Sequence, residues 1–133
     1  MLKIPHTQTL KTILFAGFAA AIFLTAAVNT VIADEAKIVD VEITATGDRT
    51  YSISVTIAHA DTGWDHYANR WDVLDDKGEL IDSRVLAHPH VNEQPFTRSL
   101  RVKIPAGVKT ITIVAADSVH GDNEQTVDVE VPE

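Results

Sequence analysis

After residue 33 the chain alternates apolar and polar residues over short stretches, which is the pattern of half-buried β-strands. Short turns containing Gly or Pro separate several of these stretches. The alternation predicts strands at residues 37–46, 51–59, 70–75, 79–86, 96–104, 108–116 and 126–131. The expected inward side chains of the first and third strands are Val39, Val41, Ile43 and Ala45, and Trp71 and Val73.

Seven short strands in about 100 residues, with an inward Trp on the third, indicate an all-β fold. We expect an immunoglobulin-like or fibronectin III-like sandwich of about seven antiparallel strands in two sheets, formed by residues 34–133. A chain of this length can bury enough apolar surface to fold as one domain without disulfides.

Residues 1–33 have a different composition. They contain no acidic residue, their only full charges are Lys3 and Lys11, and residues 12–28 form an uncharged run. Small residues end this segment at Ala33, as at a signal-peptide cleavage site. We predict a signal peptide helix over residues 1–33, cleavage after Ala33, and a periplasmic or secreted protein. An uncleaved membrane anchor is the alternative, because the apolar run approaches the ~20 residues that span a bilayer.

The charge and the cysteine content exclude several functions. Residues 34–133 keep all 19 acidic residues and nine basic ones, a net charge of −10. Binding of nucleic acid needs a basic face, so we expect no nucleic-acid partner. The absence of Cys excludes disulfides, iron–sulfur clusters, thiolate zinc sites and a Cys nucleophile. Only His and carboxylates remain as strong metal ligands.

Histidine is concentrated at one end of the predicted sandwich. Strand alternation places the three longest connections, residues 60–69, 87–95 and 117–125, at the same end. All five histidines of the predicted domain lie there, and they are His59, His66, His88, His90 and His120. We therefore expect at least three of the five imidazoles to lie within about 10 Å of one another, as ligands of one ion must.

Because side chains alternate between the two faces of a strand, three polar residues at that end are expected to point inward: His59, Arg98 and Asp117. A buried charge must be paired or ligated, so Arg98 is expected to pair with Asp117, Glu93 or a loop carbonyl. For any single His, a hydrogen bond within a loop is the simpler explanation.

The histidines together favour a site for a divalent transition metal, Zn, Cu(II), Ni or Fe. Its expected ligands come from His59, His66, His88, His90 and His120, with Asp117 as a carboxylate ligand. The alternative is a metal-free periplasmic module that uses the same loops to bind a protein or small ligand. The sequence leaves open whether the protein is an enzyme.

The order of these residues resembles the metal centre of the desulfoferrodoxin and superoxide reductase family. The shared features are a His closing the second strand, a second His seven residues later, a Trp-led strand, and a residue three before a His-Gly pair. The family has a Cys ligand where this chain has Asp117, so the resemblance implies a metal among the loops but not superoxide reduction. Residues 88–98 also resemble small uncharacterised exported bacterial proteins, a likeness that implies no function.

Overall fold

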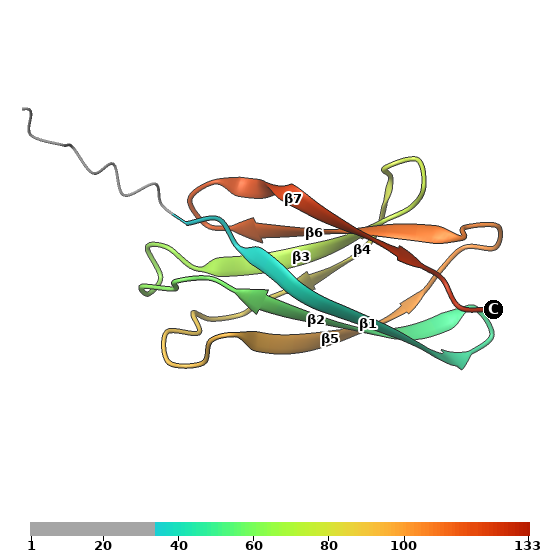
Figure 1. Ribbon diagram of the computed structural model, residues 1–133, viewed down its shortest axis with the longest axis horizontal. Coiled ribbons are helices and arrows are strands. Elements are labelled where there is room, and N and C mark those ends of the chain that lie inside the picture. The colour runs from blue at the N-terminus through green and yellow to red at the C-terminus, as the bar shows by residue number, and fades with distance from the viewer. Residues whose placement is uncertain (1–33) are drawn as a thin grey trace, which may run out of the picture. The chain divides into compact units, whose positions relative to one another are not determined.

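The computed structural model describes residues 34–133, which form an all-β domain (Figure 1). The signal peptide helix expected for residues 1–33 lies outside the described residues. The strands are β1 (Lys37–Gly47), β2 (Thr50–Ala58), β3 (Ala68–Leu74), β4 (Leu80–Val85), β5 (Phe96–Lys103), β6 (Thr110–Asp117) and β7 (Gly121–Glu130).

All strand pairs are antiparallel, and they form one sheet in the order β1-β2-β5 and a second in the order β4-β3-β6-β7. The predicted all-β sandwich of about seven antiparallel strands is therefore confirmed. Its assignment to the immunoglobulin-like or fibronectin III-like type stays a prediction.

The core between the sheets follows the alternation in the sequence. On β2, every second residue from Tyr51 to Ile57 is buried, and Trp71 and Val73 of β3 are fully buried opposite them. Within the described residues, the core and the partly buried side chains packed against it run from Ala36 to Val131. Burial of each large apolar side chain contributes roughly 1.5–3 kcal/mol before the entropy cost of folding.

The predicted inward face of β1 is wrong at its start. Val39 is 55% exposed, whereas Ile38 is buried. The pairing of β1 with β2 is irregular between Ile38 and Asp40, so Val39 has no partner residue on β2. Side chains alternate strictly between faces, so this extra residue changes which positions point inward: Ile38 does before it, and Val41 and Ile43 do after it.

The expected long connection at residues 117–125 is also wrong. β6 ends at Asp117 and β7 already begins at Gly121, so only three residues form the turn. Gly121 has a backbone φ of +73°, which glycine adopts without strain. The tight turn places Asp117 and His120 beside each other.

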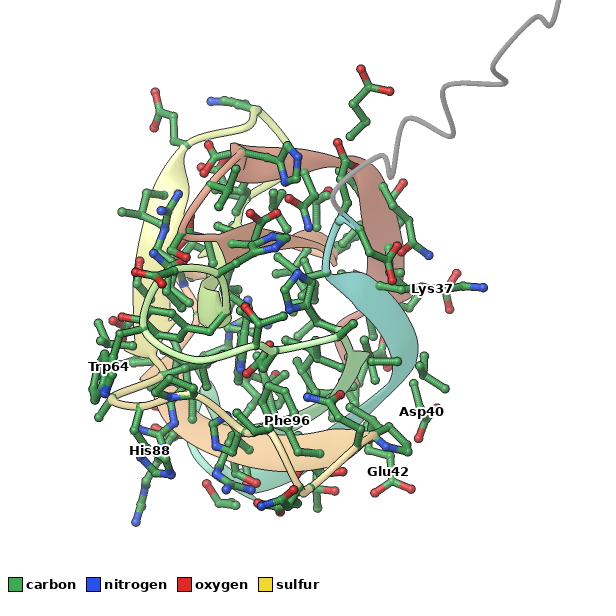
Figure 2. The ribbon with its side chains drawn as sticks, turned by 90° about the vertical axis from the view of Figure 1, so that its left-hand side faces the viewer. Lys37, Asp40, Glu42, Trp64, His88 and Phe96 are labelled. Atoms are coloured by element: carbon green, nitrogen blue, oxygen red, sulfur yellow. The ribbon has the colours of Figure 1, made fainter. Side chains whose placement is uncertain are left out.

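The connections β2–β3, β4–β5 and β6–β7 gather at one end of the domain, as expected (Figure 1). Figure 2 looks at this end, with Trp64 and His88 on one side and Lys37 on the other. Residues 34–133 contain no helix with the length and hydrophobicity of a membrane span.

Candidate metal centre

His59 lies immediately after β2, and its burial continues the inward alternation of that strand. Its backbone N–H donates to the side-chain oxygen of Gln94 at 2.9 Å, which ties it to the β4–β5 connection. Its ring Nδ1 lies 2.5 Å from Oδ1 of Asp61, so the carboxylate fixes the ring orientation and leaves Nε2 directed toward the loops.

Asp61 joins two connections at this end of the domain. Besides His59, its carboxylate accepts hydrogen bonds from the backbone N–H of Ala68 at 3.0 Å and of His90 at 2.7 Å. Sequence reasoning missed Asp61. The backbone N–H of Asp61 donates to the His59 carbonyl at 2.8 Å, so the chain turns after β2 and strand alternation no longer predicts where the Asp61 side chain points.

His66 lies between His59 and Asp117. Its backbone is fixed by a local bridge in which Thr62 N–H donates to the His66 carbonyl at 3.0 Å. Its ring Nε2 is 3.2 Å from Nε2 of His59 and 3.2 Å from Oδ1 of Asp117. The Nε2 atoms of the two imidazoles therefore face each other, and Nε2 of His66 also lies beside the buried carboxylate of Asp117.

Asp117 ends β6 and accepts several hydrogen bonds in the β6–β7 turn. Backbone N–H groups of Val119 and His120 donate to Oδ1 at 3.0 and 2.8 Å, and Nδ1 of His120 lies 2.9 Å from both oxygens. Burial raises the pKa of Asp117, but the hydrogen bonds from His120 and Val119 outweigh it and lower that pKa below its ordinary value. Asp117 is thus an anion at neutral pH.

One ligand atom each of His59, His66 and Asp117 lies within 4.8 Å of the others. Two donors about 2.1 Å from one ion and 3.2 Å apart subtend an angle of about 100° at that ion. Such an angle suits a divalent transition metal. Two neutral nitrogens and one carboxylate oxygen are also the donor types that such metals share.

His120 joins this group through Asp117. The ring centroids of His59 and His66 are 4.6 Å apart, and those of His66 and His120 are 5.5 Å apart. At least three imidazoles therefore lie within about 10 Å of one another, as predicted from the loop arrangement.

His88 and His90 are not brought into the group that converges on Asp117. The ring of His90 stacks on Phe96 at 3.9 Å, with an interplanar angle of 11°, and its Nδ1 is 3.9 Å from Asp61. His88 is exposed, with its ring 4.6 Å from that of His90. The His90 ring is held against Phe96, and the His88 ring lies beside His90. Neither residue is therefore proposed as a ligand of the ion at His59, His66 and Asp117.

Arg98 lies on the inward-facing side of β5 and pairs with Glu93, one of its three expected partners. The guanidinium donates to both carboxylate oxygens at 3.1 and 3.0 Å and lies over the Phe96 ring. This pair raises the pKa of Arg98 and lowers that of Glu93, whose carboxylate is held chiefly by the Arg98 hydrogen bond. Arg98 therefore pairs with Glu93 and not with Asp117, whose carboxylate contacts His66 and His120.

The sequence matches no protein-family model. A protein of Halomicrobium mukohataei named "Putative lipoprotein" is 36% identical over 96 residues, 72% of this chain and 47% of that protein. The chain thus spans about half the length of this curated relative. Among solved structures, a superoxide reductase (1Fe-SOR) from Giardia intestinalis is similar with a TM-score of 0.42 and 19% identity, over 68% of this chain and 95% of that one.

His90 supplies a pH prediction. Its ring is buried, its ring nitrogens have no hydrogen-bond partner within residues 34–133, and burial followed by the charge of Arg98 lowers its pKa. Because the pKa of His90 in the folded protein lies below its unfolded value of ~6.5, the unfolded chain binds the proton more readily. Stability therefore decreases as the pH falls below about 6.5, by at most about 1.4 kcal/mol per pH unit. His90→Phe is expected to reduce this fall between pH 7.5 and 5.5. Urea unfolding of both proteins at the two pH values measures it, and parallel pH profiles would refute it.

Proposed function

We propose that the loop end of this domain binds one divalent transition metal ion through Nε2 of His59, Nε2 of His66 and the carboxylate of Asp117. The observation that supports this most strongly is the 3.2 Å spacing of the two Nε2 atoms next to a buried aspartate. Zn, Cu(II), Ni and Fe accept such a donor set, whereas Mg²⁺ and Ca²⁺ prefer oxygen ligands throughout.

The residues around the proposed ligands suit this role. Asp61 holds Nδ1 of His59, the carboxylate–histidine pairing that orients metal ligands and raises their basicity. His120 contacts both oxygens of Asp117 through Nδ1, which supports a role in orienting that carboxylate. The lowered pKa of Asp117 keeps it ionised wherever the imidazoles are neutral.

The proposed location is the cell envelope or the exterior. The signal-like segment of residues 1–33 supports export, and the relative named "Putative lipoprotein" is consistent with it. A periplasmic and a secreted location both fit. The net charge of −10 over residues 34–133 supports a role without nucleic acid.

Removal of one ligand at a time tests the proposed site. In a competition titration of the metal-free protein with Zn²⁺, His59→Ala, His66→Ala and Asp117→Asn are expected to weaken binding at least about 100-fold. Loss of a residue that only orients a ligand costs about 10–100-fold, which Asp61→Asn should show. His88→Ala is the control and should bind as the wild type does. Wild-type affinity in all three ligand variants would contradict the site.

A metal-free interaction module remains the second candidate because each of the three connections exposes a large apolar residue. These are Trp64 at 67%, Val91 at 51% and Val119 at 53% exposure. Exposed aromatic and aliphatic residues commonly anchor protein interfaces. This candidate predicts no Zn²⁺ binding in the same titration, so one experiment separates the two functions.

A further inference from the structure

The segment before β1 reaches the proposed metal centre from a part of the sequence remote from the histidine loops. The main-chain carbonyl oxygen of Asp34 lies 2.7 Å from Nε2 of His59. On the other side of the ring, Nδ1 lies 2.5 Å from the Asp61 carboxylate. Both ring nitrogens therefore face oxygen acceptors.

An imidazole that binds an ion through Nε2 carries its ring proton on Nδ1, which here faces the Asp61 carboxylate. The Asp34 carbonyl oxygen, 2.7 Å from Nε2, then lies next to the same ion and can bind it as well. Donors about 2.1 Å from an ion and 2.7 Å apart subtend about 80° at it, an angle that five- and six-coordinate ions accept.

Side chains of β7 fix this segment in place. Asn123 donates from Nδ2 to the carbonyl of Ala36 at 2.9 Å. Gln125 accepts from the backbone N–H of Ile38 at 3.0 Å and donates to its carbonyl at 3.3 Å. β1 and β7 belong to different sheets, so these amides connect the two sheet edges that run alongside each other in Figure 1.

Burial gives the segment a second anchor. Ala36 and Ile38 both belong to the hydrophobic core, and Lys37 begins the pairing with β2. Asp34 lies two residues before the buried Ala36, so the anchoring of Ala36 restricts the position of the Asp34 carbonyl. The view in Figure 2 shows β1 starting beside the loop end of the domain, near the labelled Lys37.

We propose that the main-chain carbonyl of Asp34 is a fourth ligand of the metal ion, and that Asn123 and Gln125 hold residues 34–38 closed over the site. This inference rests on the proposed function. The ion then links the β2 end, the β6 end and the segment before β1, so metal binding stabilises the start of the domain as well as the loops.

Hydrogen–deuterium exchange on the full chain, without metal and with saturating Zn²⁺, tests the proposal. Zn²⁺ is expected to slow exchange at least about 10-fold in a peptide covering residues 34–38. The turn at residues 105–109, at the opposite end, should not change. The measurement uses the unaltered protein and so does not depend on the folding of any variant.

A variant adds an independent readout. Asn123→Ala combined with Gln125→Ala is expected to lower Zn²⁺ affinity about 10–100-fold, the range found for residues that position ligands. The Zn²⁺-dependent protection of residues 34–38 should also be lost. Glu124→Ala is the matched control, because Glu124 lies between the two amides in the sequence and its side chain is exposed.

The outcomes separate the two proposals. If Zn²⁺ binds through His59, His66 and Asp117 while exchange at residues 34–38 stays unchanged, the Asp34 ligand is refuted and the metal site stands. If the unaltered chain binds no Zn²⁺, both proposals are refuted. Slowed exchange together with weakened binding in the double variant supports the fourth ligand.

Discussion

Zn²⁺ at 100 times its dissociation constant is expected to raise the melting temperature of the domain of residues 34–133 by more than about 10 °C. An ion that binds only the folded state at this concentration adds about 2.7 kcal/mol of stability. For a domain of about 100 residues, each kcal/mol moves the melting temperature by roughly 4–8 °C. Differential scanning calorimetry with and without Zn²⁺ measures the shift.

The shift should depend on pH and on the metal. Histidine ligands must be neutral to bind, and an ordinary imidazole titrates near ~6.5, so the increment should be large at pH 7.5 and fade toward about pH 5. The pKa of Asp117 is lowered, so this carboxylate stays ionised over that interval and the loss comes from the imidazoles. Equal shifts with Mg²⁺ and Zn²⁺, or a shift abolished by salt, would indicate general attraction to the acidic surface instead.

Asp61→Ala is expected to lower the free energy of unfolding by about 3–5 kcal/mol in metal-free buffer. The substitution removes the acceptor for Nδ1 of His59 and for the backbone N–H groups of Ala68 and His90. Each buried donor left without a partner costs about 1–3 kcal/mol. The large effect arises because one carboxylate serves two connections.

Urea unfolding in the presence of a chelator measures this loss, since the chelator removes any contribution from bound metal. Asp65→Ala is the matched control, because Asp65 is an exposed residue of the same connection and should change stability by less than about 0.5 kcal/mol. A loss for Asp61→Ala no larger than that of the control would show that the carboxylate does not organise the loops.

The sequence predicted the strands and the clustering of His59, His66 and His120 because alternation reports directly which face of a strand is buried. On β2 the alternation continues one residue past the strand end, which correctly placed His59 inward. The bulge at Val39 was not predictable, because an extra residue in one strand leaves the apolar pattern of that strand nearly unchanged.

The first half of β7 escaped prediction for a different reason. Its inward residue there is the polar Asn123, and the stretch from Gly121 to Gln125 contains no apolar residue, so it resembles a loop. Asp61 was missed because loop conformation depends on tertiary hydrogen bonds that sequence patterns do not record. The stacking of His90 on Phe96, which separates it from the proposed ligands, is likewise a tertiary contact.

Anomalous diffraction at the zinc absorption edge, from crystals of the protein grown with Zn²⁺, would locate the bound ion. The proposed site predicts one strong peak about 2.0–2.2 Å from Nε2 of His59, Nε2 of His66 and an oxygen of Asp117. An ion held instead by His88 and His90 or by surface carboxylates alone, or no ion between these three residues at saturating Zn²⁺, would contradict it.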